Sequence, residues 1–340
     1  MSTLAQDIEP RVVKWLWFDR IPRGMISLLA GLPDGGKSLF TIYLTAQVSR
    51  LAAVLISARE DPAHEVLRPR LEAAGANLSR VRLANHVTLP SGIDYLAREI
   101  AEHQVELLII DPVADHLDGG VHRSTDSIRQ VTHALADLSE QTGVAILLVE
   151  HALKSVSRNA HPLAAIAGGN SGLRAAARMA FIGGKDPDDS ERVLLCAVKH
   201  NISAEPKPLA FTLDSARFAD SNGNESTTSV LTFREEADFD VMDLLVKPKN
   251  EKAGRPPAKR ARAAEWLAAY LSCAPDHEAP VKDVEEDARS VGITLHTLDR
   301  AAKLDVGVER FQRGRVWWWR LPQELIDAAE RDDEDDGDHP

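Results

Sequence analysis

The chain has 340 residues, 44% of them hydrophobic and 27% charged, with a formal net charge of −12 at pH 7. This length allows one large α/β core and a small second domain. No run of about 18 apolar residues occurs, so no membrane span is expected. The first ten residues lack the features of a secretion signal, and the two cysteines lie far apart. We therefore expect a cytoplasmic protein without a disulfide scaffold or a cysteine zinc site.

Charge is distributed unevenly along the chain. Residues 326–340 hold eight acidic residues and one arginine, whereas residues 247–262 hold seven basic residues and one acid. The acidic end is expected to be disordered. It is either a solubilising extension, or a segment that competes with DNA or recruits a protein partner. Because a basic segment is present, the negative total charge does not exclude nucleic acid.

Short apolar runs alternate with stretches whose apolar residues recur every three or four positions. The runs predict buried strands at 26–30, 53–57, 81–83, 107–110 and 144–149. The periodic stretches predict helices at 37–50, 62–74, 93–103 and 127–141. This alternation predicts an α/β fold with a mostly parallel sheet covered on both faces. Further strands, expected to add in antiparallel fashion, follow at 179–182, 193–199, 209–213 and 229–233.

A glycine-rich segment joins the first of these strands to the first helix. It reads Gly-Leu-Pro-Asp-Gly-Gly-Lys-Ser from Gly31 to Ser38 and matches the P-loop pattern in full. Such glycines let backbone N–H groups surround phosphates, and the helix N-terminus adds positive potential. The alternative is a plain glycine-rich turn. We expect ATP and Mg²⁺ here, with Lys37 reaching the β- and γ-phosphates and Ser38 binding the metal ion. The predicted nucleotide contacts are Gly31, Pro33, Asp34, Gly35, Gly36, Lys37, Ser38 and Leu39.

Two carboxylates follow predicted strands. The strand at 107–110 ends in Asp111, as a Walker B motif does, so Asp111 is a second candidate Mg²⁺ ligand. Glu60 follows the strand at 53–57 and is a candidate base that orients and deprotonates the attacking water. The alternative role, an acid at a helix N-terminus, suits its neighbour Asp61 better.

A histidine and a polar loop follow the strand at 144–149. His151 could contact the γ-phosphate and report its loss, or be an ordinary histidine at a strand end. The loop at 152–173 is long and contains glycines, as functional loops often do. It could present Lys154 and Arg158 to a nucleic-acid backbone, or be a plain surface excursion.

The C-terminal region predicts a second, smaller fold. Helices are expected at 258–271, 281–290 and 294–304, followed by a hairpin of strands 308–311 and 316–321. Three helices and a hairpin describe a winged helix-turn-helix domain. Such a domain binds DNA or, alternatively, a protein. Of the adjacent Trp317, Trp318 and Trp319, at least one is expected in the core. The predicted DNA contacts are His296, Arg300 and Lys303 on the third helix, and Arg313 and Arg315 at the hairpin tip.

Residues 15–202 resemble the RepA-like branch of RecA-type ATPases, the replicative helicases of plasmids and phages. The resemblance rests on the P-loop and on Arg-Ile-Pro-Arg-Gly-Met at 20–25, Ser-Ala-Arg-Glu-Asp-Pro at 57–62, Arg-Pro-Arg-Leu-Glu-Ala-Ala-Gly-Ala at 68–76, Ile-Ile-Asp-Pro at 109–112, Glu-His-Ala-Leu-Lys-Ser at 150–155 and Ala-Val-Lys-His-Asn at 197–201. It implies a hexameric ring with ATP between subunits and single-stranded DNA in the channel. It also supports Glu60 as the base and His151 as a sensor.

The same resemblance implies a residue that acts on the neighbouring subunit's nucleotide. Lys199 matches the lysine of the last motif, but relatives often place an arginine just after it, where this chain has His200 and Asn201. Lys199 or Arg178 could take the arginine's place. The C-terminal region resembles that of AAA-family ATPases from mobile elements, through Gly-Arg-Pro-Pro at 254–257 and the tryptophan-rich strand.

The predicted domains are a RecA-like ATPase at 1–246, a basic linker at 247–257, a winged-helix domain at 258–322, and an acidic tail at 323–340. The predicted function is a DNA-dependent ATPase, as a ring-forming replicative helicase of a plasmid, phage or integrated element. One alternative is an ATP-gated recombination mediator, loader or clamp that does not unwind DNA. Another is a sequence-specific DNA-binding regulator with an ATPase switch, in which the winged helix reads a duplex site.

Overall fold

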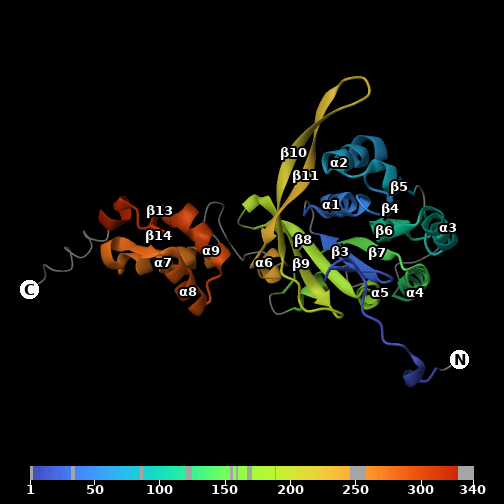
Figure 1. Cartoon of the computed structure of the whole chain (residues 1–340), viewed down its shortest axis with the longest axis horizontal. Coiled ribbons are helices and arrows are strands. Elements are labelled where there is room, and N and C mark those ends of the chain that lie inside the picture. Colours follow the sequence, from blue (N-terminus) through green and yellow to red (C-terminus); the bar gives the residue numbers. More distant parts are fainter. Residues whose placement is uncertain are drawn as a thin grey trace, which may run out of the picture. The chain divides into compact units, whose positions relative to one another are not determined.

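The computed structural model describes residues 3–31, 35–84, 87–118, 125–153, 156–157, 160–166, 171–187, 189–245 and 258–327. The chain divides into two compact units (Figure 1). The first comprises Met1–Glu236 and Asp240–Lys247, and the second Ala237–Phe239 and Pro248–Pro340. Within the described ranges, no helix has the length and apolar character needed to cross a membrane.

A large sheet forms the centre of the first unit. Over the described residues it has nine strands in the order β11-β10-β9-β8-β3-β7-β6-β4-β5. The strands are β3 (Ile26–Gly31), β4 (Ala53–Ala58), β5 (Val81–Leu83), β6 (Val105–Asp111), β7 (Ala145–His151), β8 (Met179–Asp186), β9 (Asp189–His200), β10 (Leu209–Ala219) and β11 (Glu225–Glu236). The six from β5 to β8 run parallel, and the other three add in antiparallel fashion.

Helices cover both faces of this sheet, and Figure 1 shows α1 and α2 on one side and α4 and α5 on the other. The helices are α1 (Lys37–Ser49), α2 (Arg68–Ala73), α3 (Ile93–His103), α4 (Thr125–Thr142), α5 (Ser171–Ala176) and α6 (Val241–Leu245). Shorter helical turns are η1 (Ala5–Asp7), η2 (Ala63–Leu67), η3 (Leu78–Arg80), η4 (Val113–His116) and η5 (Pro162–Ala165). A separate two-stranded sheet pairs β1 (Trp15–Trp17) with β2 (Ile21–Pro22).

Side chains alternate between the two faces of the parallel strands, so each face of the sheet has its own apolar core. On one face, Leu29 and Ile109 join a cluster with residues of α1 and α2. Their neighbours Leu28 and Leu108 are fully buried and point to the opposite face, because successive strand side chains alternate. All six residues of β3 are buried, as expected for a central parallel strand. The predicted mostly parallel α/β sheet is therefore confirmed.

Two of the predictions for this unit need correction. β8 was expected to be antiparallel but pairs parallel with β3, because α5 returns the chain to the amino edge of the sheet before β8 begins. The helix expected at 62–74 begins as the π-helical turn η2 and becomes α-helical only at Arg68. The last two strands are also longer than predicted: β10 pairs with β9 only over Leu209–Thr212, but with β11 as far as Ala219.

The second unit contains three helices and a small sheet. The helices α7 (Ala258–Ser272), α8 (Val281–Ser290) and α9 (Leu295–Arg300) confirm the three that were expected, and α9 continues into the π-helical η8 (Ala301–Val306). The predicted hairpin is β13 (Glu309–Arg313) and β14 (Val316–Arg320). β12 (Glu278–Pro280), which was not predicted, follows the short turn η7 (Pro275–His277) and pairs with β14.

Local chemistry explains how this unit is held together. The hydroxyl of Thr294 accepts a hydrogen bond from the N–H of Thr297 and so caps α9, as expected. Trp319 is only 3% exposed and packs with Leu267 and Leu298 in the core. Trp317, two positions earlier, is 45% exposed. At least one tryptophan of the three lies in the core, as predicted.

Candidate functional site

The predicted phosphate loop connects β3 to α1. Gly35 is buried, and Gly36 precedes the helix with a φ of 77°, a left-handed conformation that favours glycine. A Cβ on Gly31 would lie 1.9 Å from Cγ of Lys37, so glycine there leaves room for the lysine stem. Leu39, in the first turn of α1, packs against the apolar cluster beneath. The unpaired N–H groups at the start of α1 can therefore serve an anion at this loop.

The carboxyl ends of neighbouring parallel strands meet beside this loop. Gly31 pairs in register with His151 at the end of β7. Asp111 at the end of β6 pairs in register with Ala58, two residues before Glu60. Ligands of open α/β sheets bind at this edge. The fold thus brings four candidates from four separate segments, Lys37, Glu60, Asp111 and His151, to one edge of the sheet.

His151 connects the lysine of the loop to the predicted base. Lys37 Nζ lies 3.2 Å from His151 Nδ1, and His151 Nε2 lies 3.2 Å from Glu60 Oε1. An ammonium group can only donate, so Nδ1 must accept and the ring proton must be on Nε2, from which it is donated to Glu60. His151 in this arrangement is neutral. About half of the His151 and Glu60 side chains is exposed, at 51% and 45%, so both remain accessible to a ligand.

Asp111 occupies the deepest position in the site. Its residue is 6% exposed, and its Oδ1 has no hydrogen-bond partner among the described residues. Burial raises the pKa of Asp111 to about 6, with a further increase from Asp61 and Glu60 that Lys37 partly offsets. A buried carboxylate without a partner is costly unless a cation joins it.

The donor set around Asp111 fits Mg²⁺. Carboxylate and hydroxyl oxygens are the protein ligands that this ion prefers. Ser38, half-buried in the first turn of α1, supplies a hydroxyl next to Lys37, while its carbonyl accepts a hydrogen bond from Thr41. The orphaned Oδ1 of Asp111 is the observation in this structure that favours a cation.

Supporting residues near the site lie in the segments at 57–62 and 68–76, but their contacts were not predicted from the sequence. Asp61 forms an ion pair with Arg70 at 2.9 Å. The backbone N–H of Arg59 donates to the carbonyl of Asp111, and its guanidinium donates to the carbonyl of Val87. These bonds fix the segment that carries Glu60 relative to β6. A single sequence gives little signal for them, since each is a long-range contact of an ordinary surface residue type.

A buried histidine ties β4 to the segment after Asp111. His116 Nδ1 lies 2.8 Å from the carbonyl of Pro112, so Nδ1 carries a proton and donates. His116 Nε2 lies 2.8 Å from Ser57 Oγ in β4. Burial is the main cause that lowers the pKa of His116, so the neutral ring accepts from the serine hydroxyl. Sequence reasoning missed this pair.

Lys199 and Arg178 lie at the opposite edge of the sheet. Lys199 stands in β9 beside Ala180, near the start of β8, and its Nζ donates to the carbonyl of Arg174 at 2.6 Å. Burial, and then the charge of Arg178, lower the pKa of Lys199. The N–H of Arg178 donates to the carbonyl of Ile26, the first residue of β3. Neither residue shares an edge with Lys37 in the same copy, so a role toward a neighbouring copy stays a prediction.

The structure corrects one of the predicted DNA contacts. Arg300 was expected to face a groove but is only 9% exposed, because it packs into the second unit at the last residue of α9. Arg313 is exposed, and its guanidinium pairs with Glu278 and lies 4.8 Å from the centre of the Trp318 ring. Its role toward phosphate stays a prediction.

The other predicted contacts are placed only in part. Lys303 is exposed on η8, and Arg315 is exposed beside Gly314 at the tip of the β13–β14 hairpin. Pro33 and Asp34 in the phosphate loop, and Lys154 and Arg158 after β7, lie outside the described residues. The side chain of His296 also lies outside them.

The comparison with known families bears on the first part of the chain. Residues 2–156 match the family model of an AAA domain. This AAA-domain region includes Lys37, Glu60, Asp111 and His151, whereas Lys199 and the second unit lie beyond it.

A curated relative is similar over part of the chain. The chain is 28% identical over 134 residues to the DNA repair protein RadA of Streptococcus pneumoniae, which covers 38% of this chain and 31% of RadA. The chain therefore spans about a third of the length of this relative. The AAA-domain match, the RadA similarity and the mostly parallel sheet together support a P-loop ATPase with a RecA-like core.

Proposed function

We propose that this chain is a DNA-dependent ATPase that hydrolyses ATP at the carboxyl edge of its large sheet. The hydrogen-bonded series Lys37–His151–Glu60 carries this proposal, because it joins a phosphate-binding lysine to a carboxylate base. Asp111 lies at the same edge and supplies a buried negative charge. Phosphoryl transfer needs this combination of positioning and charge neutralisation.

The protein's own residues suggest an order of events. The γ-phosphate of ATP competes with His151 for the ammonium group of Lys37, because that group can turn from the imidazole to an anion. When Lys37 turns to the phosphate, His151 still donates to Glu60 through Nε2–H, and its Nδ1 loses the donor that Lys37 supplied. Glu60 then orients the attacking water and takes its proton. His151 would report the presence of the phosphate to the segment after β7.

Asp111 and Ser38 would hold Mg²⁺, which neutralises charge on the phosphates when bound. Without a cation, the ionised carboxylate of Asp111 is a buried negative charge. The raised pKa of Asp111 reflects the free-energy cost of burying that charge.

The coupling to DNA rests on separate support. RadA, the similar protein, is by its name a DNA repair protein. The second unit combines three helices with a β-hairpin, and we assign it as a winged helix-turn-helix domain with Lys303 and Arg315 toward nucleic acid. We further propose a cytoplasmic, ring-forming helicase, with six copies and ATP between them, in which Lys199 or Arg178 acts on the neighbour's nucleotide.

A recombination mediator or clamp is the second candidate function. The similarity to a protein named for DNA repair supports it. This candidate predicts ATP-dependent binding to single-stranded DNA without strand separation.

The deciding experiment compares wild type with Glu60→Gln and with Glu65→Gln, a nearby exposed acid on η2 that serves as the matched control. ATP hydrolysis is measured with and without single-stranded DNA, and unwinding is measured on a forked duplex. We expect DNA to stimulate wild type and Glu65→Gln alike. Glu60→Gln should lose about 10²-fold or more of the rate while still binding nucleotide.

The possible outcomes separate the two candidates. Unwinding by the wild type, lost with hydrolysis in Glu60→Gln, supports the helicase. Hydrolysis without unwinding supports the mediator or clamp. Full activity of Glu60→Gln would remove Glu60 from the mechanism, and hydrolysis that ignores DNA would contradict the proposed coupling.

A further inference from the structure

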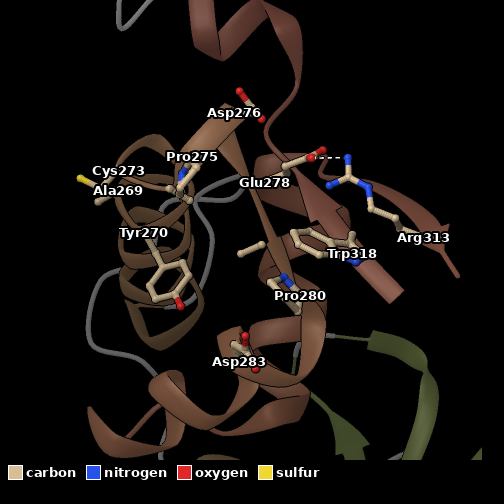
Figure 2. Close-up of a pocket in the computed structure, with 12 residues that line it drawn as sticks. Ala269, Tyr270, Cys273, Pro275, Asp276, Glu278, Pro280, Asp283, Arg313 and Trp318 are labelled. Atoms are coloured by element: carbon tan, nitrogen blue, oxygen red, sulfur yellow. Dashed lines mark hydrogen bonds and ion pairs between the residues drawn. The ribbon is translucent and has the colours of Figure 1, made fainter. Parts of the chain in front are cut away.

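We propose that the second unit binds an arginine- or lysine-bearing peptide segment of a partner protein in a pocket of about 610 Å³. The pocket lies where the end of α7, the turn η7, β12 and the start of α8 meet β14 (Figure 2). It belongs entirely to the second unit and is separate from the proposed ATP site. Its volume is within the range of pockets that take several side-chain groups.

The walls of the pocket are mostly apolar. Figure 2 shows Tyr270 from α7 on one side and Trp318 from β14 on the other. Small apolar residues and prolines complete the walls, namely Ala269, Ala274, Pro275, Ala279 and Pro280. Such a surface suits the aliphatic stem of a lysine or arginine, whose charged head then reaches the rim. The aromatic faces also favour a cation over a neutral group.

Glu278 is already neutralised within the fold. Its side chain is 4% exposed and receives hydrogen bonds from both Arg313 and Arg320. Desolvation works to raise the pKa of Glu278, but the bonds from Arg320 and Arg313 outweigh it and lower the pKa. Arg313 is thereby held against Trp318 as part of the wall. These residues contribute shape to the pocket, and the two positive charges of Arg313 and Arg320 are balanced only when Glu309, which also pairs with Arg320, is counted with Glu278.

The remaining carboxylates leave the pocket negative. Asp276 and Asp283 line it, and neither has an ion pair or side-chain hydrogen bond with another described residue. Asp287, nearby on α8, accepts a hydrogen bond from the hydroxyl of Tyr270 at 2.8 Å. Burial first, then the hydrogen bond to Asp287, and then the charges of Asp287 and Asp283 raise the pKa of Tyr270 to about 12. A phosphate backbone would be repelled, whereas a guanidinium or ammonium group would be attracted.

The test uses a fluorescein-labelled hexapeptide, Gly-Ala-Arg-Pro-Arg-Ala, with a matched peptide in which citrulline replaces both arginines. Citrulline keeps the shape of arginine and removes its charge. Binding to the full-length protein is followed by fluorescence anisotropy at low salt, where exposed charges are least screened. The variant is Asp276→Asn with Asp283→Asn. The control is Asp299→Asn with Glu324→Gln, which removes the same charge from exposed positions of the same unit outside the pocket.

We expect the pocket variant to bind the arginine peptide roughly tenfold more weakly than wild type does. The citrulline peptide should bind wild type about as weakly as the arginine peptide binds the pocket variant. The control variant should bind the arginine peptide as tightly as wild type does. Because all proteins in this comparison keep the acidic residues after 326, any binding of the peptide to that region contributes equally to each.

Cys273 gives an independent readout. It is exposed and lines the pocket, whereas Cys196, the other cysteine, is buried. The arginine peptide should slow alkylation of Cys273 by iodoacetamide, and the citrulline peptide should not. Equal affinity of the pocket and control variants, or protection of Cys273 by a DNA duplex and not by the peptide, would overturn the proposal.

Discussion

Lys37, which is expected to bind phosphate, is engaged by His151 within the chain itself. Its ammonium group rests on a neutral imidazole, which is a weaker partner than an anion. Occupation by phosphate therefore exchanges one hydrogen bond for a stronger one, without leaving His151 unpaired, since Glu60 remains on Nε2. In the absence of nucleotide, His151 therefore positions both the ammonium group of Lys37 and the carboxylate of Glu60.

Asp111 illustrates a cost that a functional residue imposes on stability. Its folded-state pKa of about 6 lies above the ordinary 3.8, so the protonated acid is the form that suits the fold. The stability that the proton contributes is complete below pH 3.8 and is lost as pH rises through about 6. A shift of this size corresponds to about 3 kcal/mol of unfolding free energy at pH 8.

Asp111→Asn should therefore stabilise the metal-free protein by up to about 3 kcal/mol at pH 8, and by little below pH 4. Urea unfolding in the presence of EDTA at several pH values measures this. ATP hydrolysis of the same variant should be lost, because the cation site is gone. If the variant is less stable than wild type at pH 8, burial of the ionised Asp111 carboxylate does not lower the unfolding free energy as proposed.

At the scale of elements, one buried hydrogen bond joins β4 to η4 beneath the site. Ser57→Ala removes the hydroxyl that faces Nε2 of His116, and we expect a loss of about 1–3 kcal/mol in unfolding free energy. Ser27→Ala in β3 is the matched control, because the Ser27 hydroxyl is fully buried and has no hydrogen-bond partner among the described residues. That variant should be as stable as wild type or more so. Equal losses in the two variants would mean that the His116 bond contributes nothing specific.

Local patterns explain which elements could be predicted. β3, β6 and β7 are continuous apolar runs, and the P-loop fixes the start of α1, so their order placed Glu60, Asp111 and His151 at one edge. The direction of β8 could not be predicted, because it depends on α5, a helix of only six residues. Strand direction is a property of the connection and not of the strand's own pattern.

The errors in the second unit have similar causes. β12 has three residues, too few for a periodic pattern, yet it places Glu278 beside Arg313 and gives that exposed arginine a partner within the fold. Arg300 was expected to be exposed because it is a basic residue of the predicted third helix, but packing at the end of α9 leaves it only 9% exposed. A single sequence gives little sign of such tertiary packing.

At the scale of the whole molecule, opposing charges lie at separate places in the sequence. Removing residues 328–340, which carry most of the acidic charge of the C-terminal end, should strengthen binding to a non-specific DNA duplex severalfold at low salt. The gain should fade above about 0.3 M salt, where screening is strong. Anisotropy titrations across salt concentrations measure this. Unchanged affinity at every salt concentration would favour a purely solubilising role.

The placement of Lys199 and Arg178 has a consequence for symmetry. Each copy carries its phosphate loop at one edge of the sheet and these two cations at the other, so a cation that serves a nucleotide serves one on a different copy. Such a contact is head-to-tail where the phosphate-loop edge of one copy meets the cation edge of the next through that pair of surfaces alone. Repeated from copy to copy, it either closes into a ring or continues as a helical filament. A two-fold dimer satisfies it only if both edges lie within one self-complementary interface, in which the cations of each copy reach the nucleotide of the other.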